Sequence, residues 1–267
     1  MKRLFNSFAI DHQTRKIFII AIYSAFLIFN IYNIVITPSI EGKISYFLLT
    51  LIILGIAIYA EYLRSLYCKM IKALTIEGDL AKALTLKMRL IKKDKLHNYQ
   101  KSLLIFDTLY NLDCDQHQKN IDLLQANQRF FQGSLDYLLI RNYTYFISYY
   151  YLNNRSLLKT YYDKLLHLKD AKIKGQKVSP LYNWDLLEAI YQLALKNYRK
   201  SHTFFKNTDT TNLNNRELAL YHLEYGRCLC KLQRYAQAKK QLQKCCETAN
   251  TAIYKQKALD LLKQLTA

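Results

Sequence analysis

The sequence predicts an all-α protein in which a helical hairpin in the membrane precedes an array of paired helices. Three observations support this prediction: two long apolar runs lie near the N-terminus, Pro and Gly are scarce, and short polar breaks recur roughly every 36 to 43 residues. We therefore expect an N-terminal cytoplasmic segment (1–16), a two-helix transmembrane hairpin (17–63) and a cytoplasmic helical region (64–267).

The two apolar runs cover residues 17–36 and 44–60, and neither contains an Asp, Glu, Lys or Arg. At 1.5 Å per residue, a helix of the first length covers roughly 30 Å, the thickness of a bilayer core. Pro38 and Gly42 between the runs favour a reversal of the chain. A cleaved secretory signal and a pair of buried core helices are the alternatives, and the length and lack of charge argue against both.

Basic residues flank the outer ends of this segment, and the loop between the runs holds a single Lys43. The positive-inside rule therefore places both termini in the cytoplasm. Residues 1–16 mix apolar and basic side chains, which is typical of an amphipathic segment on the inner leaflet or of a disordered tail.

Two polar residues interrupt the first apolar run. Asn30 and Asn33 share a helix face because they are three residues apart, so we expect them to pair transmembrane helices through hydrogen bonds. An ion path is the alternative, but two amides without a carboxylate or a base make a weak relay.

The chain is strongly basic, with 39 Lys and Arg against 20 Asp and Glu, and most of the net charge of +19 follows Leu63. Such a charge beside two spans favours contact with anionic membrane lipids. Nucleic acid is the other obvious anionic partner. We do not expect it, because the basic residues are dispersed among apolar helical positions with no helix-turn-helix or RNA-binding signature.

Five polar breaks divide the region after the hairpin, at residues 77–79, 113–115, 153–154, 196–197 and 233–234. Leu, Lys, Gln, Ala and Tyr recur at helical spacing between them, which predicts stacked helix-turn-helix units. The Lys-rich residues 170–180 are the best candidate for a flexible joint. The last sixteen residues suit a helix that closes the array.

The clearest repeat signal lies near the C-terminus. Gly226 is a small residue, Leu229 and Tyr235 follow at large positions, and Ala238 and Leu242 continue the series. In this order and spacing the segment resembles the tetratricopeptide repeat, in which small residues admit the paired helix and large residues fill the groove beside it. The resemblance implies an α-solenoid in which these five residues pack one helix on the next.

The preceding unit carries a looser version of the same pattern. Trp184, Leu187 and Tyr191 keep the spacing that the tetratricopeptide repeat shows for its first-helix Trp, Leu and Tyr. The resemblance therefore implies that these three residues also serve repeat packing.

Residues that could carry chemistry are few. Cys228 and Cys230 point to nearly opposite sides of a helix, so they and the later cysteines are better read as small core residues than as a zinc site. Asp113, Asp115 and His117 cluster near a turn and could bind a metal, although helix capping explains the two carboxylates more simply. The isolated glycines form no nucleotide-binding loop. We expect no enzymatic activity, no cofactor and no metal.

Aromatic side chains are dense around residue 147. Six aromatic residues between Tyr143 and Tyr151 surround a helix rather than forming one stripe, and Tyr161 and Tyr162 lie beyond it. Six tyrosines of this region are therefore candidates for binding a peptide in a groove, and core packing is the equal alternative. These residues are Tyr143, Tyr145, Tyr149, Tyr150, Tyr161 and Tyr162.

Together these features predict a membrane-anchored adaptor or scaffold that binds a protein or peptide at the cytoplasmic face. The alternatives are a peptide-sensing regulator at the membrane and a non-catalytic subunit of a membrane enzyme or transport complex.

Overall fold

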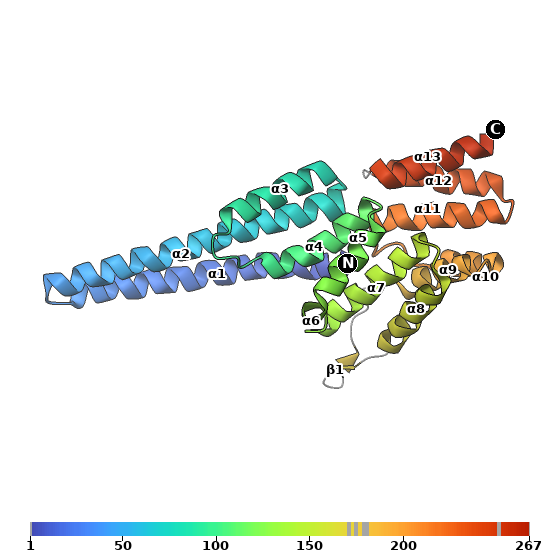
Figure 1. Cartoon of the computed structure of the whole chain (residues 1–267). Helices are drawn as coiled ribbons and strands as arrows, with labels where there is room; N and C mark the ends of the chain where they lie inside the picture. Colours follow the sequence, from blue (N-terminus) through green and yellow to red (C-terminus); the bar gives the residue numbers. More distant parts are fainter. Residues whose placement is uncertain (1, 170–171, 174–175, 178–181, 250–251, 267) are drawn as a thin grey trace. The chain divides into compact units, whose positions relative to one another are not determined.

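The computed structural model describes residues 2–169, 172–173, 176–177, 182–249 and 252–266 (Figure 1). The prediction of an all-α protein is confirmed, because these residues form α-helices apart from one π-helical turn and one pair of two-residue strands. The elements are α1 (Lys2–Ile36), α2 (Ile40–Lys72), η1 (Ala73–Glu77), α3 (Leu80–Lys93), α4 (Gln100–Asp113), α5 (His117–Ala126), α6 (Gln128–Phe131), α7 (Leu135–Tyr151), α8 (Arg155–Lys169), β1 (Lys172–Ile173), β2 (Gln176–Lys177), α9 (Trp184–Ala194), α10 (Tyr198–Asn207), α11 (Asn215–Lys231), α12 (Tyr235–Thr248) and α13 (Ala252–Thr266).

The chain divides into two compact units, residues 2–69 and residues 70–267. The first unit holds α1 and most of α2, and the chain reverses between them at Thr37, Pro38 and Ser39 (Figure 1). The side chains of residues 2–16, 18 and 19 lie outside the described part. Pro38 supplies no amide hydrogen for a continuing helix, which explains why α1 ends just before it.

One helix among the described residues, Ile40–Glu77, is long and apolar enough to cross a membrane. Its most apolar 18-residue window has a mean hydropathy of 2.0, and only 6% of that window is buried. A shorter apolar helix covers Ile20–Ile36. Large aliphatic side chains on both helices are exposed, among them Ile28 at 68% and Ile56 at 63%.

In the second unit, all five predicted polar breaks fall between consecutive helical elements. Each break contains a residue with positive φ, between 55° and 63°: Gly78, Asp115, Asn153, Lys196 and Gln233. Successive members of this set are 37 to 43 residues apart. The turn is therefore a recurring structural feature, which is compatible with a helical repeat.

Four of these turns share one hydrogen-bond pattern. In each, the amide after the positive-φ residue donates to the carbonyl oxygen five residues earlier, at 2.8–3.0 Å. The amide of the positive-φ residue itself donates to the carbonyl three residues earlier. This pair of bonds is the Schellman motif, which satisfies carbonyl groups left open at the end of a helix. It recurs at Asp115, Asn153, Lys196 and Gln233.

Each of these turns allows the second helix to pack on the first. Contacts join α4 to α5, α7 to α8, α9 to α10 and α11 to α12, and α13 packs on α12 (Figure 1). Helices α11 and α12 approach each other closely at Gly226. A Cβ atom at this position would lie 2.7 Å from Leu242 Cδ2 and 2.8 Å from its Cγ. Ala238 and Leu242 are fully buried beside it. Tyr235 instead lies at the start of α12 with 53% of its surface exposed.

Polar side chains define where several of these helices begin. Asp79, Ser134 and Asn183 each accept a hydrogen bond from a backbone amide in the first turn of α3, α7 and α9. Asn214 and Glu217 form a capping box at the start of α11, in which each side chain bonds the other residue's backbone amide at 3.0 Å. Such caps satisfy amides that have no partner inside the helix.

The predicted joint at residues 170–180 falls mostly outside the described residues. Its described members pair as a two-residue antiparallel ladder, Lys172 with Lys177 and Ile173 with Gln176.

Candidate functional site

The tyrosines of α7 and α8 divide into two groups. Tyr143 and Tyr162 face the interior of the array, where Tyr143 stacks on Tyr182 and Tyr162 stacks on Tyr191, both with ring centroids 3.8 Å apart. Tyr150 directs its hydroxyl to the buried Glu224. These three residues pack helices together, as expected if they serve core packing rather than peptide binding.

The second group is a cluster of three rings. Tyr145 stacks on Tyr161 at 4.3 Å and on Tyr149 at 5.9 Å, and Lys164 lies over the Tyr161 ring at 4.6 Å. Tyr145 and Tyr149 are less than 10% exposed, and Tyr161 is half-buried. Ring stacking thus accounts for most of the aromatic density on α7 and α8.

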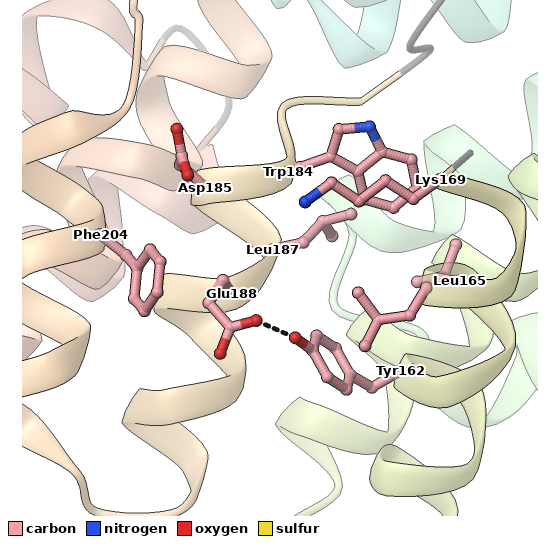
Figure 2. A pocket seen from close by; sticks show the side chains of 9 residues that line it. Tyr162, Leu165, Lys169, Trp184, Asp185, Leu187, Glu188 and Phe204 are labelled. Carbon is pink, nitrogen blue, oxygen red and sulfur yellow. Dashed lines mark hydrogen bonds between the residues drawn. The ribbon is translucent and has the colours of Figure 1, made fainter. Parts of the chain in front are cut away.

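The best-formed hollow among the described residues lies between α8 and α9, and it contains Trp184 (Figure 2). Tyr162 on α8 donates a hydrogen bond to Glu188 on α9, and Gln192 donates to the other Glu188 oxygen at 2.8 Å. The hollow has a volume of about 60 Å³. Its lining residues are Tyr162, Leu165, Leu166, Lys169, Trp184, Asp185, Leu187, Glu188 and Phe204.

This volume limits what the hollow can hold. Pockets for drug-sized ligands enclose roughly 300–1,000 Å³, whereas the hollow at Trp184 suits a few water molecules or part of one side chain. Trp184 and Lys169 border it on one side and Phe204 on another, so its wall combines apolar side chains with the polar groups of Tyr162 and Glu188 (Figure 2). We therefore treat it as a notch for a protruding side chain.

Glu224 on α11 is fully buried and joins α11 to the end of α7. It accepts hydrogen bonds from the hydroxyls of Tyr150 and Tyr151, and Arg227 pairs with it at 2.8 Å. The pKa of each tyrosine is raised well above the ordinary value for tyrosine. Burial is the main cause, and the negative charge of the nearby Glu224 adds to it. Both phenols thus stay protonated and act as donors.

A second buried ion pair joins α4 to α11. Arg216 Nε lies 2.6 Å from Asp113 Oδ1, and the hydroxyl of Tyr254 lies 3.5 Å from the same oxygen. Asp113 Oδ2 has no hydrogen-bond partner within the described ranges. Burial raises the pKa of Asp113 to about 6, because the loss of water outweighs the opposing effect of Arg216.

A third pair joins α5 to α13. Asp115 binds His117 Nε2 at 2.8 Å and also the ammonium of Lys257, and the Lys257 Nζ lies 4.3 Å from the Tyr151 ring. His117 stacks on Tyr151 at 4.7 Å, and burial lowers its pKa. The expectation that Asp113 and Asp115 cap a helix is wrong, since α5 follows Gln116 without a side-chain cap.

These three clusters connect helices, and the first two are closed to solvent. Glu224, Asp113 and Arg216 are at most 4% exposed, so a substrate in solution does not reach them. Breaking such a buried pair leaves an uncompensated charge, which strongly destabilises a fold. Sequence reasoning missed Arg216, Glu224 and Lys257, whose partners lie up to 142 residues away in the chain. The only local signal was the acid–base spacing of Glu224 and Arg227.

The six cysteines are free thiols. Cys228 and Cys245 are buried, with each sulfur 3.4 Å from a backbone oxygen, and burial raises the pKa of Cys245 to about 12. A buried thiol of this kind is unreactive. Across the described part of the chain, no group of three or more His, Cys, Asp or Glu side chains is arranged to hold a metal ion.

The two asparagines of α1 donate to their own helix. Asn30 Nδ2 bonds the carbonyl of Phe26 at 2.7 Å, and Asn33 Nδ2 bonds the carbonyl of Phe29 at 2.8 Å. Each bond uses one N–H of the side-chain amide within α1.

Comparison with known proteins found no match to a protein-family model, to a curated protein or to a solved structure. The function of the chain must therefore be inferred from its own residues.

Proposed function

We propose that this protein is a membrane-tethered scaffold. Its α1 and α2 form a two-span hairpin with both termini in the cytoplasm, and its helical region resembles a tetratricopeptide solenoid that binds a protein or peptide near the membrane. The observation that carries the proposal is the exposed apolar surface of Ile40–Glu77.

That surface is too large to be left in water. Along α2, Leu48, Ile52 and Ile56 are each more than half exposed, and Ile40 is 76% exposed. Exposed apolar patches on monomeric proteins rarely exceed a few hundred Å² unless they serve an interface. Burial in lipid recovers roughly 25 cal/mol for every Å² of apolar area removed from water. Insertion into a bilayer accounts for the exposed apolar side chains from Ile40 to Ile58, whereas Met70, Ala73 and Leu74 near the end of the helix are buried in the protein.

The scaffold role is supported by how the polar groups of the helical region are used. Its buried Asp113 and Glu224 pair with Arg and Tyr side chains, and the hollow at Trp184 suits one side chain rather than a substrate. Helical repeats commonly bind extended peptides across several units. In such a complex, the notch beside Trp184 would bind a single anchoring side chain of the peptide.

Topology is tested by thiol labelling of intact cells. A membrane-impermeant maleimide should label a Ser39→Cys variant from outside, because Ser39 lies in the loop between the proposed spans. The wild-type chain is the control: its exposed Cys68, just beyond the second proposed span, should react only after the membrane is permeabilised. Labelling of the wild-type chain in intact cells would overturn the topology.

Partner binding is tested by photo-crosslinking of the full chain in its native membrane. The crosslinking residue replaces Leu166, which lines the notch and is 40% exposed. The control replaces Thr160, an exposed residue on another face of α8. We expect a discrete adduct from position 166 alone. The same adducts from both positions, or none from either, would contradict a partner at this notch.

A further inference from the structure

Helix α3 presents an apolar stripe to its surroundings. Leu84, Met88 and Ile91 follow one another at spacings of four and three residues, which places them on one helix face. They are 39%, 60% and 47% exposed. Leu96, just beyond the helix, is 71% exposed. A continuous exposed stripe of this kind marks an interaction surface, unlike scattered single residues.

The other side of α3 is what holds the helix in place. Ala83 and Leu90 are fully buried, and Lys87 pairs with Asp107 of α4 at 2.6 Å. Asp79 caps the helix by accepting a hydrogen bond from the Lys82 amide at 2.9 Å. The apolar sector of α3 is therefore wider than the sector that the fold covers.

The charge of α3 indicates the occupant of the stripe. The fourteen residues of the helix include five basic residues and no acidic one. Two of the five pair with acids outside the helix, Lys82 with Glu77 and Lys87 with Asp107. Lys92 is four residues from Met88 and borders the stripe, and Arg89 continues the basic side. An apolar face edged with Lys and Arg is the pattern of helices that lie in the interface of an anionic membrane.

We propose that the Leu84–Met88–Ile91 stripe of α3 docks on the anionic lipid surface of the same membrane that holds the tether. This inference rests on the proposed membrane tether, since α3 begins three residues after the end of Ile40–Glu77. A second copy of the chain is a poorer occupant, because it would bring Arg89 and Lys92 at the edge of one stripe against the same basic residues of the other. Docking would add a second membrane contact and limit how the helical region moves.

The test uses depth-dependent fluorescence in the full chain. Trp184 is the only tryptophan, so a Trp184→Phe background makes Met88→Trp the sole reporter on the stripe. Met88 is exposed, so the larger ring does not disturb the core. Leu86→Trp in the same background is the matched control, since Leu86 is two residues from Met88 and therefore on the opposite side of the same helix, and the change leaves the charge of α3 as it is. Both variants are reconstituted in dibrominated phosphatidylcholine with or without phosphatidylglycerol.

With phosphatidylglycerol present, we expect the brominated chains to quench the Met88→Trp variant by about half or more and to leave the Leu86→Trp control largely unquenched. Removal of phosphatidylglycerol should abolish most of the difference. Equal quenching in both lipid mixtures would overturn the assignment to an anionic surface. An unquenched, blue-shifted emission that grows with the protein-to-lipid ratio would show a second copy on the stripe and overturn lipid docking.

Alkaline carbonate extraction of the same vesicles separates the two proposals. A chain that stays in the pellet while its Met88→Trp reporter is unquenched overturns docking of α3 alone. A chain released into the supernatant overturns the membrane tether itself.

Discussion

The close approach of α11 and α12 at Gly226 makes a sharp prediction about two substitutions. Gly226→Ala adds one methyl group, whose carbon would lie 2.7 Å from Leu242 Cδ2 and 2.8 Å from Leu242 Cγ. Leu242 is fully buried, so its side chain has little freedom to move away. The next atom, the Ala238 carbonyl oxygen, is at an ordinary contact distance of 3.7 Å. The strain therefore depends almost wholly on Leu242.

Two opposing effects set the magnitude. Alanine is favoured over glycine within a helix by about 1 kcal/mol, and overpacking of a close contact costs about 1–3 kcal/mol. We expect Gly226→Ala to destabilise the wild-type chain by about 1 kcal/mol. Leu242→Ala alone should cost about 2–5 kcal/mol through the cavity that it leaves. In that background the clash is gone, so Gly226→Ala should stabilise the chain by about 1 kcal/mol.

The assay is urea unfolding of the four full-length proteins in detergent micelles. Fluorescence of Trp184 reports unfolding of the helical region, and equal m-values among the variants would validate the comparison of free energies. The diagnostic result is the change of sign between the two backgrounds, a coupling of about 2 kcal/mol. If Gly226→Ala has the same sign and size with and without the Leu242 side chain, the reasoning from close packing is wrong.

Three further predictions concern the turns and the buried charges. Gln233→Gly should stabilise the chain by about 0.5–1 kcal/mol in urea unfolding, because Gln233 adopts a φ of 60° at a cost that glycine avoids; a gain of equal size from Gln233→Ala would refute this cause. The pKa of Asp113 is raised from 3.8 to about 6 in the folded state, so the folded chain holds a proton that the unfolded chain has released, and the stability due to this group falls as pH rises from about 4 to 6. Unfolding of an Asp113→Asn/Arg216→Met variant should lack that component, and an unchanged slope against wild type would contradict it. Glu224→Gln removes charge-assisted bonds to Arg227 and Tyr151 and should lower stability by about 2–3 kcal/mol, whereas the exposed Glu247→Gln should change it by less than about 0.5 kcal/mol.

The sequence alone determined the helical class and five of the places where one helix ends and the next begins. The five polar breaks are local signals, and each coincides with a turn that contains a positive-φ residue. The apolar character of α2 could also be predicted, because a long run without charge is independent of what lies around it. These features depend on backbone conformation and hydropathy over a few successive residues.

Only the tertiary structure decided which side chains meet. Asp113 and Arg216 are 103 residues apart in the chain, and a basic sequence offers many partners for each carboxylate, so no local pattern could select this pair. The same holds for the tyrosines of α7. Periodicity shows that the helix has aromatic side chains on several faces, but it does not show which neighbouring helix covers each face. Tyr235 and the α3 stripe are exposed for that reason: whether an apolar face is buried depends on which neighbouring helices the complete fold brings against it.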